Sequence, residues 1–360
     1  MSTPTTTPPL TGAVDDGEGP GPRRPRWWLR VIGALCALAL VAAAALWYGQ
    51  RPDAIFPEGK AFSEPIADAP RLDPASADIA ELLGDPERVP TMNLNEFGNP
   101  IYTADASTPR HDLVITRHGT EEGKWGNNVL AHQSVPIPEE VQASSGSDAK
   151  IVVIDHSTDQ VFDLWRVERI GEQWQAEWGG IYPLEGDGSS HQSAYGDGPH
   201  HVPWPEPVSR GTGSGVSSLA GVIRASELAE GEIPHALVFS TDKPCGPANS
   251  GPFRWPATTT DGFIVDAPCI PQGARVRLDP SIDLDAVPGL TPVELMIGKA
   301  LQKYGAYCID GGGARMAFAT EAARTDEHRA TYDALDLSED YHQLPNLPQE
   351  YTVLASWDGS

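Results

Sequence analysis

Two aspartates in the middle of the chain are candidates for acid–base chemistry. Asp155 and Asp163 lie on or beside adjoining predicted strands, close in sequence to Glu168 and Glu177. Glycoside hydrolysis requires two carboxyl groups that flank the scissile bond, about 5 to 10 Å apart, and such strands can supply them. The chain holds 50 acidic residues, however, so pairs of this kind also arise by chance.

A histidine and a third aspartate complete the set of candidate catalytic residues. His235 follows Pro234 at the start of an apolar strand, where either a general base or a hydrogen-bonded structural histidine fits. Asp310 ends a predicted strand and precedes glycines 311–313, where its carboxylate can also serve the backbone amides of the turn. Both a catalytic and a structural role therefore stay open for each residue.

Three tryptophans are candidate ligand-binding residues. Trp165 shares a strand face with Asp163, Trp178 ends the next aromatic strand, and Trp204 lies in a long loop. An aromatic ring beside an acid suits a sugar, because one face of the ring is apolar. The alternative for a tryptophan on a strand is a place in the core.

The sequence does not match the patterns of a zinc site or of a serine nucleophile. His191, His200 and His201 share a loop, but their irregular spacing does not match a zinc site, so we predict no metal and no cofactor. The Gly213-Ser214-Gly215 turn lacks the full pattern of a serine nucleophile.

Cysteine usage fits an oxidising compartment. Cys245 and Cys269 both lie in Pro- and Gly-rich sequence typical of loops, and we predict a disulfide between them. Cys308 lies in an apolar stretch and is expected to be a buried free thiol.

An unbroken apolar run at residues 31–48 predicts a single membrane crossing. As a helix it is about 27 Å long, close to the thickness of the hydrocarbon core, and four arginines precede it. We expect a disordered cytoplasmic tail at 1–30 and an extracytoplasmic remainder. A signal peptide cleaved near 42–44 is the alternative, and it would give a secreted protein.

Composition divides the rest of the chain. Residues 49–100 are rich in Pro and Asp and predict a stalk, while 101–321 predict one folded domain and 322–360 an acidic, partly ordered tail. The net charge of −25 should repel nucleic acid, which is therefore not an expected partner.

Strand patterns dominate the predicted domain. Eight short segments rich in β-branched and aromatic residues are bounded by Gly, Pro, Asp or Ser: 113–116, 150–154, 161–167, 173–178, 235–239, 274–278, 307–309 and 316–318. Helices are expected at 225–230 and 291–304, the latter with Thr291, Pro292 and Glu294 as a capping box, and a short one at 76–83. The predicted fold class is mainly β, an antiparallel sandwich of jelly-roll type, with a closed barrel as the alternative.

Several motifs resemble a widespread family of secreted or surface-anchored bacterial β-rich proteins of unestablished activity. They are DHSTDQVFDLWRV (155–167), GTGSGVSSLAGVIR (211–224), EIPHALVF (232–239), WPATTTDG (255–262), GARVRLDP (273–280) and ALQKYGAYCID (300–310). The resemblance spans residues 151–318 and implies an extracytoplasmic domain that binds or acts on cell-wall or environmental glycan. The chain departs from the family before Gly215, where many relatives have a longer stretch of Ser, Ala and Asp.

Three functions follow from these observations. The first is a membrane-anchored domain that binds glycan through aromatic residues, with the lipid bilayer contacted by residues 31–48. The second is a carbohydrate-active enzyme, either a glycoside hydrolase or a polysaccharide lyase. The third is a structural envelope protein without a ligand. A concave cleft with paired carboxyl groups would favour the enzyme, whereas a flat aromatic patch would favour binding alone.

Overall fold

The computed structural model describes residues 56, 61–117, 127–189, 207–249, 251–265 and 268–355. All of them belong to one compact unit, Ala54–Ser360, which is separate from Met1–Asp53. The expected membrane segment, residues 31–48, lies outside the described part. Within that part, no helix is long and apolar enough to cross a bilayer.

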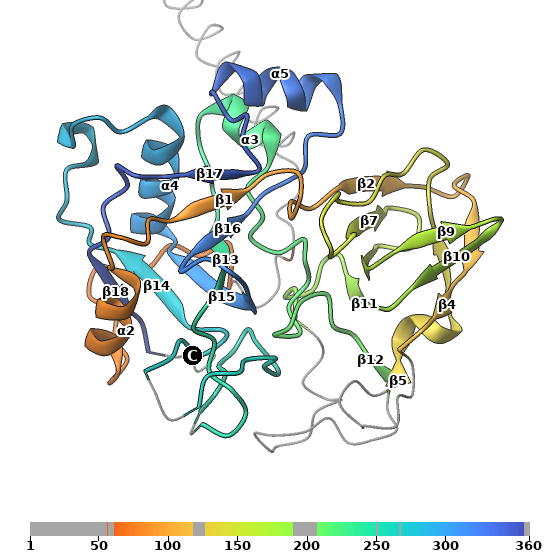
Figure 1. The fold of residues 1–360 in the computed structure, drawn as a ribbon, viewed down its shortest axis with the longest axis horizontal. Helices are drawn as coiled ribbons and strands as arrows, with labels where there is room; N and C mark the ends of the chain where they lie inside the picture. The colour runs from red at the N-terminus through yellow and green to blue at the C-terminus, as the bar shows by residue number, and fades with distance from the viewer. Residues whose placement is uncertain are drawn as a thin grey trace, which may run out of the picture. The chain divides into compact units, whose positions relative to one another are not determined.

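The unit contains two regions, each built around its own sheets. A mixed sheet of seven strands forms the centre of the larger region (Figure 1). In spatial order its strands are β17 (Tyr341–Gln343), β1 (Thr91–Asn93), β16 (Ala317–Ala319), β13 (Leu237–Thr241), β15 (Ala306–Gly311), β14 (Arg275–Leu278) and β18 (Tyr351–Val353). The pairs β1–β16 and β13–β15 are parallel, and the other neighbours are antiparallel.

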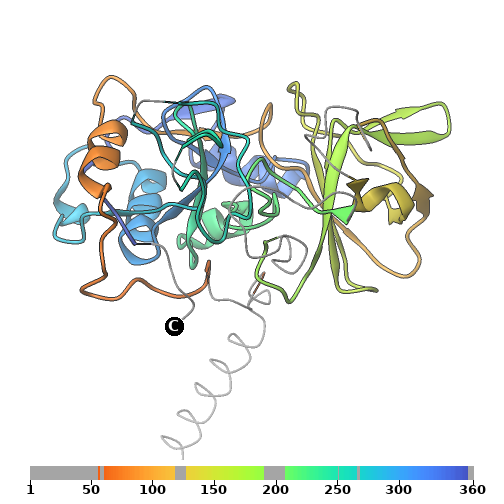
Figure 2. The same cartoon turned by 90° about the horizontal axis from the view of Figure 1, so that it is seen from below.

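Helices complete the core around this sheet. They are α2 (Ser76–Leu83), α3 (Ala225–Glu230), α4 (Pro292–Lys303) and α5 (Asp326–Ala334), with a 3-10 turn, η3 (Leu284–Ala286). The capping box predicted for α4 is confirmed, because Thr291 Oγ1 accepts from Glu294 N and the Glu294 carboxylate accepts from Thr291 N. The apolar face of α4 is buried with α2 in one cluster, and Figure 2 shows both helices at the same end of the unit.

A second region contains the shorter sheets. Its four-stranded sheet runs β11 (Trp178–Pro183), β8 (Gln160–Trp165), β7 (Ile151–Asp155) and β2 (Ile101–Ala104), and β2 is parallel to β7. Smaller sheets join β4 (Val114–Ile115), β10 (Gln173–Ala176) and β9 (Glu168–Ile170); β12 (Pro207–Val208) and β5 (Asn127–Asn128); and β3 (Arg110–Asp112) and β6 (Ser134–Pro136). A 3-10 turn, η1 (Val129–His132), follows β5.

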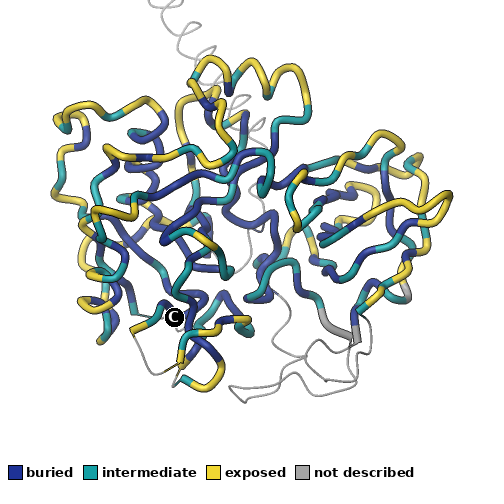
Figure 3. Tube along the Cα trace, viewed as in Figure 1, coloured by how far each residue is buried: buried dark blue, intermediate teal, exposed yellow. Residues whose placement is uncertain are grey.

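The two regions share a hydrophobic cluster. Val152 and Val161 of the four-stranded sheet are buried in it together with Val238 and Ile309 of the seven-stranded sheet. The buried part of the chain in Figure 3 follows the central strands of both regions, whereas α5 and the β9–β10 hairpin are largely exposed. This contact brings side chains from distant parts of the sequence together.

The predicted β-rich class is confirmed, but the sheets are not purely antiparallel. Parallel pairs occur in both larger sheets. The burial pattern explains the difference, because β7 is buried at all five positions and β13 at four of its five. Near-continuous burial of this kind is typical of strands in parallel pairs, because parallel sheets are covered on both faces.

The predicted stalk is wrong for its described part, residues 56 and 61–100. Helix α2, confirmed at Ser76–Leu83, packs into the main core, and β1 lies between two other strands of the seven-stranded sheet. Ser76 Oγ accepts a hydrogen bond from Val353 N at 2.8 Å, which ties this segment to the C-terminal strand β18. The strand β1 was not predicted because it has only three residues and lies in proline-rich sequence.

The acidic tail, residues 322–360, is likewise more ordered than predicted. It supplies α5 and both edge strands, β17 and β18, of the seven-stranded sheet. The Glu294 carboxylate of α4 accepts from Asn346 N at 2.7 Å, and Leu344 and Leu347 are buried. Tertiary pairing therefore orders a segment whose own pattern is too short to show a strand.

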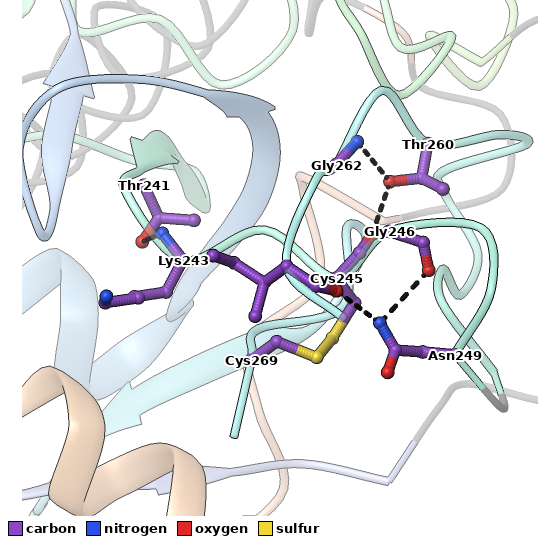
Figure 4. Close-up of a disulfide and its surroundings, with 9 residues drawn as sticks. Thr241, Lys243, Cys245, Gly246, Asn249, Thr260, Gly262 and Cys269 are labelled. Carbon is purple, nitrogen blue, oxygen red and sulfur yellow. Dashed lines mark hydrogen bonds between the residues drawn. A yellow bond between two sulfur atoms is a disulfide. The ribbon is translucent and has the colours of Figure 1, made fainter. Parts of the chain in front are cut away.

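The predicted disulfide between Cys245 and Cys269 is confirmed, and Cys308 is a buried free thiol as expected. Figure 4 shows how hydrogen bonds brace the loop that the disulfide closes. Thr260 Oγ1 donates to the carbonyl of Cys245 at 2.9 Å and accepts from Gly262 N at 2.9 Å. The loop therefore holds the segment after Thr260 in a defined position.

Replacing both disulfide cysteines by alanine should lower the free energy of unfolding by about 3 kcal/mol, because the bond restricts the unfolded chain. Urea unfolding of the 54–360 fragment measures this loss. Wild-type fragment treated with a reductant should shift to the same midpoint as the double variant. An unchanged midpoint in the double variant would contradict the stabilising role.

Candidate functional site

Asp155 lies at the end of β7 and is fully buried. Its carboxylate accepts hydrogen bonds from Ser157 N at 2.9 Å, Ser157 Oγ at 2.6 Å and Thr158 Oγ1 at 2.8 Å, and it pairs with Arg110 Nη1 at 2.8 Å. Burial by itself would raise the pKa of Asp155, but these hydrogen bonds outweigh it and lower the pKa to about 2. The geometry is that of a structural carboxylate that holds the β7–β8 turn.

Asp155→Asn should therefore lower the free energy of unfolding at pH 7 by about 2 kcal/mol. The pKa of the folded state lies below that of the unfolded state, so this stabilisation is present above about pH 4 and disappears as pH falls towards 2. Urea unfolding at pH 7 and pH 3 should show the difference from wild type shrinking at the lower pH. Asp159→Asn, at an exposed position of the same turn, is the matched control. An Asp155→Asn variant as stable as wild type would contradict this role.

His235 connects α3 to the segment before β13. Its Nε2 lies 2.9 Å from Glu227 Oε1, and its Nδ1 lies 2.9 Å from the carbonyl of Ala236. Burial alone would lower the pKa of His235, but Glu227 raises it above its ordinary value. Both ring nitrogens are engaged, so the structural role fits.

The tryptophans do not form a ligand surface in the described part of the chain. Trp178 is 3% exposed and packs in the interior. Trp165 donates from Nε1 to Asp148 Oδ1 at 3.1 Å, and the guanidinium groups of Arg117 and Arg166 lie 5.1 and 4.5 Å from its ring centroid. Trp204 and the histidines at 191, 200 and 201 lie outside the described residues.

Asp163 is a buried acid on β8, 2% exposed. Its Oδ2 accepts from Ser218 N at 2.7 Å, and a Cβ at Gly211 would lie 1.9 Å from the same oxygen, so only glycine fits there. Burial raises the pKa of Asp163 to about 7, although hydrogen bonds from Ser218 and Ser217 and the nearby Lys150 oppose the shift. Asp163 does not line the cavity to which Asp310 belongs.

A cavity of about 610 Å³ opens where the two regions meet. Residues of β1, β13, β15 and β16 line it, together with Asp148 and Lys150 before β7 and Tyr341 of β17. Glycines 311–313 form part of the wall, which leaves main-chain atoms accessible to a ligand. The rings of Phe97 and Tyr341, 6.0 Å apart, add an aromatic part.

Asp310 belongs to the wall of this cavity. Its Oδ1 accepts from Gly213 N at 3.3 Å and from Gly311 N at 3.0 Å. Burial is the largest cause that raises the pKa of Asp310 to about 7, and the carboxylate of Asp261 adds to it, while Lys150 opposes it. Of the predicted catalytic residues, Asp310 is therefore the one that lines this cavity.

Asp148 and Lys150 face the same cavity and had no signal in the sequence. Lys150 Nζ lies 3.1 Å from Asp148 Oδ2. Burial would raise the pKa of Asp148, but Lys150 and the hydrogen bond from Trp165 lower it, so this carboxylate stays ionised. Burial likewise would lower the pKa of Lys150, but Asp148 and Asp310 raise it. The cavity thus contains one carboxyl group with a raised pKa and one with a lowered pKa.

Asp261 is a further residue that sequence reasoning did not select. It follows Thr260 in the disulfide-braced loop, and its Oδ1 accepts from Gln272 Nε2 at 2.6 Å. A Cβ at Gly213 would lie 2.2 Å from Asp261 Cγ, while the amide of Gly213 donates to Asp310. Gly213 therefore allows the two carboxyl groups to approach each other. The motif WPATTTDG was the available signal, since Asp261 is its only acid.

Within the described ranges, no group of three or more His, Cys, Asp or Glu side chains is arranged to hold a metal ion. Comparison of the chain with protein-family models, with curated proteins and with solved structures finds no match. The resemblance to bacterial surface proteins accordingly stays a prediction.

Proposed function

We propose that the cavity binds a glycan and that Asp310 is a general acid for hydrolysis of a glycosidic bond. One observation carries the proposal: Asp310 and Asp148 line the same cavity, and their surroundings shift their pKa values in opposite directions. A pair of carboxyl groups whose pKa values are shifted apart in this way is the usual basis for assigning acid and base roles. A pKa of about 7 keeps Asp310 partly protonated at neutral pH.

The proposed reaction uses water and needs no further reactant. The bond between the anomeric carbon and the glycosidic oxygen breaks, and Asp310 gives its proton to the leaving oxygen. Water adds to the anomeric carbon and gives a proton to the ionised Asp148. Lys150, beside Asp148, keeps that carboxylate charged and is a positioning residue.

The lining supports a neutral, hydroxyl-rich ligand. Carboxylates and main-chain groups of 311–313 can hydrogen-bond to hydroxyl groups, and Phe97 and Tyr341 can stack against the apolar face of a sugar. Among the described residues that line the cavity, Lys150 is the only cation, and it lies beside two carboxyl groups. A uronic acid polymer, the substrate of a lyase, therefore fits less well. We propose in addition that residues 31–48 anchor this unit at the outer side of a membrane.

Glycan binding without cleavage is the second candidate, since the same lining would serve both functions. To test them, the 54–360 fragment is incubated with a panel of cell-wall and environmental polysaccharides, and both bound fragment and released reducing ends are measured. Release of reducing ends supports hydrolysis, and retention without release supports binding alone. The absence of both across a broad panel would refute the proposal.

A further inference from the structure

A second cavity, of about 330 Å³, has a wall rich in arginine. Arg71, Arg254 and Arg275 line it together with the aromatic residues Trp255 and Tyr307. Among the described lining residues, Glu64 is the only acidic one, and none is shared with the first cavity. The local charge is therefore opposite to the net charge of −25 that the chain carries as a whole.

Both arginines of β14 are held by carbonyl groups, Arg275 in the wall of this cavity and Arg277 outside its lining. Arg275 donates from Nε to Tyr304 O and from Nη2 to Glu64 O, each at 2.9 Å, and its guanidinium lies 5.2 Å from the Tyr307 ring centroid. Arg277 donates to Gln302 O at 2.9 Å and to Ala67 O at 3.1 Å. A carbonyl oxygen accepts a hydrogen bond without cancelling the formal charge of the donor, so both guanidinium groups remain cationic.

These hydrogen bonds also fasten residues 64–67 to the sheet, but that task does not require a charge. A neutral amide donor would bond to the same carbonyl groups without the cost of removing a cation from water. Burial is the largest cause that lowers the pKa of Arg275, and Arg277 adds to it, while Tyr307 and Glu64 oppose it only in part. A bound oxyanion would offset it, because a guanidinium binds a carboxylate or phosphate through two parallel hydrogen bonds.

We propose that this cavity is a binding site for the carboxylate or phosphate group of an anionic ligand, contacted by Arg275 and Arg71. Arg254, which pairs with Asp73, adds to the positive charge of the same wall. The volume lies within the range of small-molecule sites, which begins at about 300 Å³. Trp255 and Tyr307 supply apolar surface for the part of the ligand next to the anion.

The test is a calorimetric titration of the 54–360 fragment with inorganic phosphate, with glucuronate and with glucose at low salt. Both anions should bind and glucose should not bind at this cavity, and the tighter anion identifies the source of the charged group. Arg275→Gln should weaken anion binding at least tenfold, as expected for the loss of one charge-assisted contact. Arg275→Lys, which keeps the charge but not the forked geometry, should give an intermediate affinity.

Arg71→Gln provides a second variant, because Arg71 is exposed and its replacement should leave the fold intact if Arg275→Gln does not fold. Arg329→Gln, at an exposed position on α5, is the matched control and should bind the anions as the wild type does. Absence of binding by both anions would overturn the proposal. Equal binding by wild type, Arg275→Gln and Arg71→Gln would overturn it as well. Neither outcome bears on Asp310, which lies in the other cavity.

Discussion

Asp310→Asn should abolish glycan cleavage by the 54–360 fragment, with a loss of roughly 100- to 10 000-fold in kcat, the range for removal of a general acid. Asparagine has nearly the same shape and can still accept the hydrogen bonds from Gly213 and Gly311, but it cannot donate the proton that the leaving oxygen needs. Initial rates of reducing-end release, measured on the substrate that the polysaccharide panel identifies, give the size of the effect.

The pH profile separates a catalytic from a merely structural role for Asp310. Wild-type activity should fall as pH rises through about 7, because the acid form of Asp310 is lost there. The residual activity of Asp310→Asn should not show that fall. Asp333→Asn, at an exposed position on α5, is the control and should keep both the rate and the profile. Wild-type activity in Asp310→Asn would remove the assignment.

Asp163→Asn should make stability less dependent on pH. The pKa of Asp163 is about 7 in the folded protein, above the ordinary value of 3.8, so its contribution to stability is full below about pH 4 and is lost as pH rises through 7. Between pH 5 and pH 8 the variant should therefore lose less stability than wild type, by about 2 to 3 kcal/mol. Asparagine can still accept the hydrogen bond from Ser218 N.

Urea unfolding of both proteins at several pH values measures this difference. Asp333→Asn should run parallel to wild type, since that residue is exposed. Parallel curves for Asp163→Asn and wild type would show that the buried carboxyl group does not titrate as proposed. Cleavage activity should survive in Asp163→Asn at pH 6, because Asp163 does not line the cavity.

Local patterns in the sequence predicted much of the fold. The segment 291–304 contains its own cap and its own apolar stripe, and α4 forms there as expected. Strands such as β7 and β8 were recognisable because each has enough β-branched and aromatic residues to show a pattern. The disulfide was predicted because both of its cysteines lie in sequence typical of loops.

Short elements with distant partners were not predictable in this way. β1, β17 and β18 have three residues each, which is too short for alternation to show, and they are strands because the seven-stranded sheet pairs with them. Strand direction was missed for a different reason, because it depends on the crossovers between strands and not on the residues of one strand. That the two larger sheets pack as a sandwich stays a prediction.

Part of the candidate site was predictable from local sequence, and part depends on distant segments of the chain. Asp310 was selectable because three glycines follow it at the end of a strand, and the structure places it at a cavity. Asp148 and Lys150 come from another part of the chain, and only tertiary contact gives them opposing effects on the pKa of Asp310. Asp155 looked equally suitable in the sequence, but its surroundings make it a structural anion.

The most direct test of the central claim is amide chemical-shift mapping by NMR on the 54–360 fragment with oligosaccharides from the polysaccharide panel. A ligand of the proposed site should shift the amides of glycines 311–313 and of Tyr341 most strongly, and Phe97 should respond with them. Shifts centred on the β8 surface around Trp165, or no shift at 311–313 with any oligosaccharide, would contradict a glycan site at Asp310.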